Sequence, residues 1–287
     1  MTDQPAVSNT QIHTQRSRGE LLQLLHRRQG IFVVPNPWDA GSARLLAHLG
    51  FEALATTSAG LAFSLAKADG LAVVTREETL ANARTIVEAT ELPVTADLEN
   101  GYGDAPEACA ETIRLAADAG LVGGSIEDAT GNPADPIYPL ELAVERVKAA
   151  VAAARNLAVP FTLTARAENL IHGRPDLNDT IRRLEAFAAA GADVLFAPGL
   201  TTREEIAAVV RAVAPKPVNV VMGLSKGSFT INELADLGVR RISLGSSLAR
   251  AAYGAFLRAA EEIHDKGRFT FAQDLVPYAV FNGIFSR

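Results

Sequence analysis

The chain has 287 residues, 48% of them hydrophobic, which is enough to build a large core within one domain spanning residues 1–287. Its formal net charge of −6 gives no electrostatic reason to bind nucleic acid or an anionic membrane. One cysteine, Cys109, excludes a disulfide within the chain. The polar N-terminal stretch and the lack of a long apolar run predict no signal peptide and no transmembrane helix, so we expect a cytoplasmic protein.

The beginning of the chain predicts a loose tail, a helix and a buried strand. Residues 1–15 contain many Gln, Thr and Ser residues, as flexible tails do. Leucines between Leu21 and Leu25 form an apolar face on a helix over residues 16–28, which Gly30 ends. Residues 31–35 contain no polar side chain, as expected for a strand that is buried on both faces.

The same unit of strand and helix then repeats along the chain. Further strands are predicted over residues 51–56, 92–97, 121–127, 161–166, 193–197, 218–222 and 241–245, and helices over residues 42–49, 76–90, 105–119, 140–155, 178–190, 203–212 and 231–237. Eight alternations without a change in composition predict a (β/α)₈ TIM barrel. An open doubly wound sheet is the alternative, but its Gly-x-Gly-x-x-Gly turn is missing after the first strand.

Two more helical stretches follow the eighth strand, over residues 247–266 and 270–285. A barrel needs only one helix after its last strand. The second stretch is apolar and must bury its face, so we expect it to pack on a partner subunit.

An acidic motif follows the third strand, with Asp97 and Glu99 at its start and Gly101 and Gly103 at its end. Side chains alternate along a strand, so the two carboxylates are predicted to point to the same side. Adjacent carboxylates repel each other unless a cation lies between them, and Mg²⁺ prefers such oxygen ligands. A solvated acidic turn is the alternative interpretation.

Candidate site residues also come from other predicted strands, at the end of a barrel where catalytic groups lie. They include Ser58, Ala59 and Gly60 after the second strand, Glu127 and Asp128 after the fourth, Arg166 and Glu168 after the fifth, and Asn219 within the seventh. The guanidinium of Arg166 suits a substrate carboxylate, because its N–H groups match two oxygens. A structural ion pair with Glu127 or Glu168 is the other interpretation, and both can hold at once.

These motifs, taken in order, resemble the isocitrate lyase/phosphoenolpyruvate mutase superfamily over about residues 30–275. They are Thr-Ser-Ala-Gly at 57–60, Asp-Gly at 69–70, Asp-x-Glu-x-Gly-Tyr-Gly at 97–103, Ile-Glu-Asp at 126–128 and Ala-Arg-x-Glu at 165–168. The resemblance implies a barrel that depends on Mg²⁺, or alternatively Mn²⁺, and acts on small 2-oxo or 2-hydroxy carboxylic acids through an enolate-like intermediate. It also implies a homo-oligomer, a dimer or tetramer, formed by swapping the last helix.

The resemblance implies roles for individual residues. Asp97 would bind the metal directly, Glu99 and Glu127 would hold its water ligands, and Asp69 would lie behind them. Arg166, Ser58 and Glu127 would take part in catalysis, while the substrate would lie against Trp38, Ser58, Ala59, Gly60, Asp97, Arg166 and Asn219. Family members usually carry Asp at the position of Glu99, which is one methylene longer.

The loop after the fourth strand departs from the family pattern. Lyases of the family carry Lys-(Lys/Arg)-Cys-Gly-His there, and mutases carry Lys and Asn, but residues 129–139 contain no Cys, Lys or His. Asn132 is the candidate for the mutase asparagine. Cys109 lies in a predicted helix and suits packing, which leaves Tyr102, Tyr138 and His172 as candidate proton donors.

Three functions therefore remain open. The first is a carbon–carbon lyase or decarboxylase, the second a phosphonopyruvate-type mutase or hydrolase, and the third a non-catalytic barrel that binds 2-oxo acids. A Schiff-base aldolase is disfavoured because the sixth strand carries no lysine.

Overall fold

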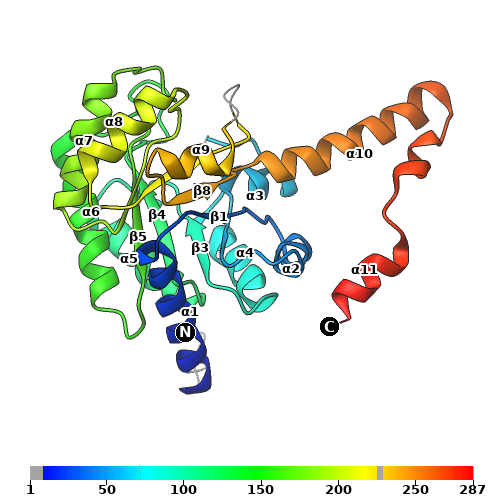
Figure 1. Cartoon of the computed structure of the whole chain (residues 1–287), viewed down its shortest axis with the longest axis horizontal. Helices are drawn as coiled ribbons and strands as arrows, with labels where there is room; N and C mark the ends of the chain where they lie inside the picture. The colour runs from blue at the N-terminus through cyan, green and yellow to red at the C-terminus, as the bar shows by residue number, and fades with distance from the viewer. Residues whose placement is uncertain (1–8, 71, 225–228, 287) are drawn as a thin grey trace.

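The computed structural model describes residues 9–70, 72–224 and 229–286. Eight parallel strands form one sheet in the order β1-β8-β7-β6-β5-β4-β3-β2 (Figure 1). The strands are β1 (Phe32–Val34), β2 (Leu54–Ala55), β3 (Val94–Asp97), β4 (Gly123–Glu127), β5 (Thr162–Arg166), β6 (Val194–Phe196), β7 (Val218–Val221) and β8 (Arg241–Ser243). The two ends of the sheet approach each other, because Ala55 N donates to Pro35 O at 3.1 Å. The predicted TIM barrel is thus confirmed, and the sheet is nearly closed.

Helices alternate with the strands and surround the barrel. They are α1 (Asn9–Arg27), α2 (Ala40–His48), α3 (Ser58–Ser64), α4 (Arg76–Glu88), α5 (Pro106–Asp118), α6 (Leu140–Arg155), α7 (Leu177–Ala189), α8 (Arg203–Val213), α9 (Ile231–Asp236), α10 (Ser247–Lys266) and α11 (Tyr278–Phe285), with a 3₁₀ turn η1 (Thr270–Asp274). Helices α4, α8 and α9 begin with a capping box, in which a threonine and a glutamate satisfy each other's backbone N–H groups.

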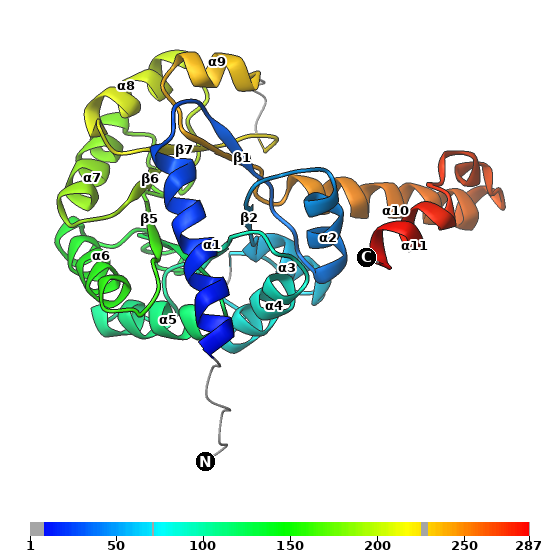
Figure 2. The same ribbon diagram turned by 60° about the horizontal axis from the view of Figure 1, so that its bottom comes forward.

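The first helix starts earlier than the sequence predicts. Helix α1 begins at Asn9, so residues 9–15 belong to the helix, and only residues 1–8 of the predicted tail lie outside the described residues. Its early turns are held by tertiary contacts, because Gln15 Nε2 donates to Ala117 O at 2.8 Å and to Leu121 O at 2.9 Å. The helix lies across the end of the barrel where the strands begin (Figure 2).

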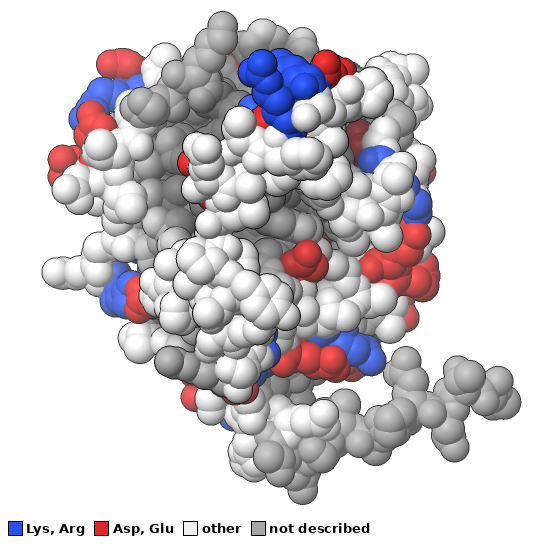
Figure 3. Space-filling model, turned by 90° about the vertical axis from the view of Figure 1, so that its right-hand side faces the viewer, with Lys and Arg blue, Asp and Glu red and all other residues white. Residues whose placement is uncertain are grey.

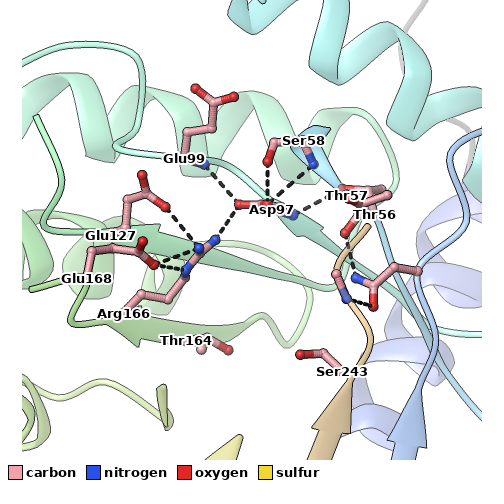
Figure 4. Close-up of polar contacts among 12 residues, drawn as sticks. Thr56, Thr57, Ser58, Asp97, Glu99, Glu127, Thr164, Arg166, Glu168 and Ser243 are labelled. Carbon is pink, nitrogen blue, oxygen red and sulfur yellow. Dashed lines mark hydrogen bonds and ion pairs between the residues drawn. The ribbon is translucent and has the colours of Figure 1, made fainter. Parts of the chain in front are cut away.

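Helix α3 was not predicted. The sequence predicts no element between residues 56 and 76, but Thr57 caps a short helix there by accepting a hydrogen bond from Gly60 N at 3.2 Å. A threonine at this position satisfies a backbone N–H that the first turn of a helix leaves open. The helix places Ser58 in its first turn, beside the carboxyl end of β3 (Figure 4).

The C-terminal part of the chain forms an arm that projects from the barrel (Figure 1). Helix α10 has the predicted bounds and ends at Gly267, whose φ of 58° is readily adopted by glycine. The single helix predicted over residues 270–285 is instead η1 and α11, since Pro277 disfavours a helical conformation at Val276. Helix α11 returns to contact α2, where Arg44 Nη1 donates to Phe285 O at 3.0 Å.

The arm leaves large apolar side chains exposed, among them Phe256, Phe269, Leu275 and Tyr278. Figure 3 views the molecule from the side to which the arm projects and shows wide areas without charge there. Among the described residues, no helix is both long and apolar enough to cross a membrane.

Candidate active site

The guanidinium of Arg166 is at the centre of the acidic cluster where the strands end (Figure 4). Its Nη1 lies 2.7 Å from Asp97 Oδ1, and its Nη2 lies 2.7 Å from Glu168 Oε1 and 3.3 Å from Glu127 Oε2. The ring of Phe196 lies beneath it, 5.1 Å from Cζ. The predicted ion pairs of Arg166 are therefore present with both Glu127 and Glu168, and they join the ends of β3, β4 and β5.

Asp97 links this arginine to the second strand. Its Oδ2 accepts hydrogen bonds from Ser58 Oγ at 2.8 Å and from Ser58 N at 3.3 Å, while its backbone N donates to Thr56 Oγ1 at 3.0 Å. Both carboxylate oxygens of Asp97 are thus engaged by groups that lie on opposite sides of it. Ser58 and Arg166, which are both predicted to contact the substrate, therefore contact the same side chain, Asp97, from opposite sides.

Strand β3 ends at Asp97, and the chain then turns sharply. Glu99 and Tyr102 have φ values of 47° and 62°, a left-handed conformation that side chains other than glycine rarely adopt. Such backbone strain is concentrated at functional sites. The Glu99 carboxylate points away from Arg166 (Figure 4), and Glu99 lines a cavity of about 410 Å³.

The cluster has more negative than positive charge. Burial raises the pKa of Glu99 to about 7, and the charges of Asp97 and Asp69 add to the effect. Burial, and then Asp97, also raise the pKa of Asp69. The pKa of Glu127 rises well above its usual value through burial, although Arg166 opposes the rise. One guanidinium therefore does not neutralise the surrounding carboxylates.

These residues are suitable ligands for a divalent cation. Carboxylate oxygens are the ligands that Mg²⁺ prefers, and burial followed by the negative charge of Asp97 raises the pKa of both Glu99 and Asp69. In the described parts of the chain, however, no three His, Cys, Asp or Glu side chains are already placed to hold a metal ion. Arg166 separates Asp97 from Glu127, and Glu99 is turned away, so the three predicted ligands do not yet converge.

A buried layer supports the cluster from behind. Glu168 is nearly inaccessible, and its backbone N donates to Asp128 Oδ1 at 2.8 Å. Asp128 in turn pairs with Arg183 Nη1 of α7 at 3.1 Å. The predicted strand ends did not reveal this connection, because Arg183 lies on a helix far along the chain.

Other predicted site residues lie at different distances from the cluster. Asn219 is fully buried inside the barrel, where its Nδ2 donates to Ser243 Oγ at 2.9 Å and its Oδ1 accepts from Arg241 Nε at 2.8 Å. The Trp38 ring packs near the Tyr253 ring of α10, with 6.4 Å between their centroids. Gly60 is buried in α3, and its backbone N–H donates to Thr57 Oγ1 at 3.2 Å, so Ser58 is the residue of that segment that contacts the cluster.

The candidate proton donors are mostly engaged. Tyr102 donates to Thr79 Oγ1 at 2.8 Å, and Tyr138 donates to Asp104 Oδ1 at 2.5 Å. His172 Nε2 lies 3.7 Å from Glu168 Oε2. Cys109 is buried in α5, and its Sγ donates weakly to Asn100 O at 3.7 Å, in agreement with a packing residue.

Two further residues of the mouth were missed by sequence reasoning. The first is Thr56, and the second is Asn36, which links the ends of β1, β2 and β8. Asn36 Nδ2 donates to Thr56 O at 2.9 Å, and Asn36 Oδ1 accepts from Leu244 N at 2.8 Å and from Gly245 N at 3.0 Å. Asn36 directly follows the strand of residues 31–35, so its place after a buried strand was the available signal.

An eight-stranded parallel barrel with acids and an arginine at its carboxyl end has the architecture of TIM-barrel enzymes. The chain matches the family model of phosphoenolpyruvate phosphomutase over residues 21–264. It is 30% identical over 260 residues to an oxaloacetate decarboxylase of Paraburkholderia xenovorans, covering 88% of this chain and 81% of the relative.

Solved structures of proteins with lyase or mutase descriptions are similar to this chain along nearly its whole length. The crystal structure of a candidate lyase or mutase from Burkholderia cenocepacia J2315 is 59% identical, with a TM-score of 0.93, and the match covers 96% of this chain and 98% of the other. A 2,3-dimethylmalate lyase is 28% identical, with a TM-score of 0.82 and coverage of 95% and 94%. The chain therefore belongs to the isocitrate lyase/phosphoenolpyruvate mutase superfamily. It is an enzyme of this superfamily, whose members generally depend on a divalent metal ion, and its relatives indicate a lyase.

Proposed function

We propose that this enzyme is a Mg²⁺-dependent carbon–carbon lyase or decarboxylase that acts on a small 2-oxo or 2-hydroxy carboxylic acid. The observation that carries the proposal is the partly buried Arg166, which lies among Asp97, Glu127 and Glu168 where the strands end. The related oxaloacetate decarboxylase and 2,3-dimethylmalate lyase support it, since their names describe reactions of a 2-oxo and a 2-hydroxy acid.

Arg166 is the proposed partner of the substrate carboxylate. Its planar guanidinium can donate two parallel hydrogen bonds to a carboxylate, and its fixed charge does not depend on pH in the physiological range. The neighbouring acids Glu168, Asp97 and Glu127 raise its pKa well above the usual value, although burial acts in the opposite direction. The arginine is therefore held charged and in place before any substrate arrives.

Ser58 is the proposed partner of a second substrate oxygen. Its hydroxyl and backbone N–H both point to Asp97 Oδ2 (Figure 4), so they already converge on one oxygen. Donors held in advance stabilise developing negative charge without having to reorganise, and each such donor contributes on the order of 3 kcal/mol in comparable sites.

Asp97, Glu99 and Glu127 are the residues that would hold Mg²⁺, with Asp69 behind them. Breaking a bond next to a 2-oxo group leaves an electron pair on the substrate as an enolate, and a bound divalent ion supplies a Lewis acid for that charge. The unbalanced negative charge around Glu99 supports this assignment.

Chemistry at a carbon–phosphorus bond is the second candidate. The matching family model, that of a phosphomutase, and the lyase-or-mutase relative favour it. The absence of lysine from residues 129–139 weighs against it, because nothing in that loop offers the phosphoryl group a positive charge. A barrel that binds 2-oxo acids without turnover is the third candidate.

Product analysis separates these candidates. The purified protein with Mg²⁺ is incubated with oxaloacetate, with a methylisocitrate-like acid and with phosphonopyruvate. The proposal expects pyruvate from either of the first two, and neither phosphate nor phosphoenolpyruvate from the third. Formation of phosphoenolpyruvate by a mutase, or of phosphate by a hydrolase, from phosphonopyruvate alone would establish the second candidate, and tight binding without any product would establish the third.

We also propose that the arm, α10 to α11, packs on a second copy of the chain in a homo-oligomer, a dimer or tetramer. Phe269 and Tyr278 are 65% and 81% exposed in the single chain. Apolar side chains gathered in this way mark interaction surfaces.

A further inference from the structure

A second cavity lies at the end of the barrel opposite the acidic cluster. It has a volume of about 570 Å³, within the range of small-molecule sites. Helix α1 contributes Gln23, His26 and Arg27 to its wall, while Thr162 and Arg240 come from where β5 and β8 begin. Figure 2 shows α1 lying across this end of the barrel.

The cavity wall is positively charged. Arg27, Lys216 and Arg240 line it, and none of the three forms an ion pair with a carboxylate of residues 9–70, 72–224 or 229–286. Asp193 also lines the cavity, but its carboxylate already accepts from Arg155 Nη2 at 2.6 Å and Leu163 N at 2.8 Å. The three cations donate to neutral oxygens only, Lys216 Nζ to Ala192 O at 2.6 Å, Arg240 Nη1 to Arg28 O at 2.9 Å and Arg27 Nη2 to Gln23 Oε1 at 3.2 Å. These acceptors carry no negative charge, so no carboxylate of the described chain balances the positive charge of the wall.

Three buried polar atoms in this region have no hydrogen-bond partner within the described chain. They are His26 Nε2 and Thr162 Oγ1, from residues of the wall, and Arg241 Nη1, from the start of β8. Thr162 and Arg241 are only 3% and 5% exposed. Buried polar atoms in folded proteins are nearly always hydrogen bonded, so the two unpaired atoms that belong to lining residues, on His26 and Thr162, indicate a missing partner at this cavity.

His26 shows what that partner must offer. Its Nδ1 lies 2.8 Å from Leu22 O, which can only accept, so Nδ1 carries the hydrogen and Nε2 presents a lone pair. Burial, and then the charges of Arg241 and Arg240, lower its pKa to about 3 and keep the ring neutral. The missing partner must therefore donate a hydrogen bond to His26 while it accepts from the cations.

We propose that this cavity binds a small oxyanion that also carries a hydroxyl group, such as hydrogen phosphate or a hydroxycarboxylate. The oxyanion oxygens face Lys216, Arg240 and Arg27, and the hydroxyl donates to His26 Nε2. Water could pair the unpaired atoms, but only an oxyanion would also bring a negative charge to the three cations of the wall. The site is distinct from the acidic cluster, because it lies where the strands begin.

Calorimetry at neutral pH with two matched pairs of probes tests the site. Inorganic phosphate is compared with sulfate, and glycolate with acetate, since the second member of each pair lacks the hydroxyl. In at least one pair we expect the hydroxyl-bearing anion to bind about ten-fold more tightly, the effect of one hydrogen bond. A difference between phosphate and sulfate identifies the ligand as a phosphate, and a difference between glycolate and acetate identifies it as a hydroxycarboxylate. Equal affinity within both pairs, or no saturable binding, would overturn the proposal.

Three variants place the binding. Lys216→Gln should lower the affinity for the anion about ten-fold, because a charge-assisted hydrogen bond is lost. Lys148→Gln, on the outside of α6, should leave this affinity unchanged. Arg166→Lys should also leave this affinity unchanged. An effect of Arg166→Lys equal to that of Lys216→Gln would place the anion at the acidic cluster and contradict the proposal.

Substitution of the histidine tests its role separately. His26→Phe keeps an aromatic ring beside Phe32 and removes the acceptor. The preference for the hydroxyl-bearing probe should disappear, while the affinity for its partner without a hydroxyl stays the same. If His26→Phe still prefers the hydroxyl-bearing probe, His26 does not accept a hydrogen bond from the hydroxyl.

Discussion

Arg166 and Asp97 join the ends of β5 and β3 through a 2.7 Å contact between Nη1 and Oδ1, which reaches past the intervening strand β4. Both residues are proposed to hold ligands, the arginine a substrate carboxylate and the aspartate a cation. A cation at Asp97 would compete with Arg166 for the same oxygen and so would free the guanidinium. Metal and substrate binding are therefore expected to assist each other.

Arg166→Lys should lower kcat/KM about 100-fold or more, because lysine keeps the charge but cannot make forked contacts with Glu168 and a substrate at once. Steady-state kinetics at saturating Mg²⁺ measures the loss, with circular dichroism to confirm the fold. Turnover within a few-fold of the wild type would remove Arg166 from the proposed substrate site.

The affinity for Mg²⁺ should depend on the negative charge of residue 99 more than on the length of its side chain. Glu99→Asp places the family's usual residue there and should keep Mg²⁺ affinity near that of the wild type. Glu99→Gln removes the charge and should weaken Mg²⁺ about ten-fold or more. Titration of Mg²⁺ by calorimetry compares the two variants, and equal affinities in both would exclude Glu99 from holding the metal.

His26 should make the protein less stable as the pH falls. Its pKa is about 3 in the fold against an ordinary value of 6.5, so between these values the unfolded chain binds more protons. Its contribution to stability is complete above pH 6.5 and declines as pH falls toward 3, by at most about 1.4 kcal/mol per pH unit. Urea unfolding over this pH range measures it.

The matched variants isolate this residue from the titrating carboxylates. His26→Gln should flatten the pH dependence of the free energy of unfolding, whereas His13→Gln, exposed on the same helix, should not change it. The same slope in wild type and His26→Gln would show that His26 is not held neutral by the fold.

The arm should control assembly. Replacing Phe269 and Tyr278 together by serine should lower the molar mass measured by light scattering, because both side chains are largely exposed in the single chain. Leu24→Ser, an exposed leucine of α1, is the matched control and should leave the mass unchanged. A wild-type protein that is monomeric at micromolar concentration would contradict the proposed oligomer.

Much of the fold could be predicted because its strands are buried on both faces and its helices have clear ends. Helices α6 and α10 have the predicted bounds, since Pro139 precedes the first and Gly267 follows the second. Helix α3 was missed because its seven residues are too few to show a helical period. The start of α1 was missed because its early turns depend on contacts with distant residues.

The clustering of Asp97, Glu127 and Arg166 could be predicted from the sequence, but the geometry of the candidate site could not. Asp97, Glu127 and Arg166 follow buried strands, and parallel strands bring their ends together. Alternation along a strand could not place Glu99, because β3 ends at Asp97 and the backbone then turns left-handed. The cavity beneath α1 had no sequence signal, since its cations come from segments far apart in the chain.

Calorimetric titration of oxalate, a mimic of the enolate, into the wild type and Asp97→Ala tests the central claim most directly. The account predicts that the wild type binds oxalate only when Mg²⁺ is present and that Asp97→Ala loses this Mg²⁺-dependent binding while remaining folded. Undiminished oxalate affinity in Asp97→Ala would contradict it, because the ion would then be held elsewhere or not required.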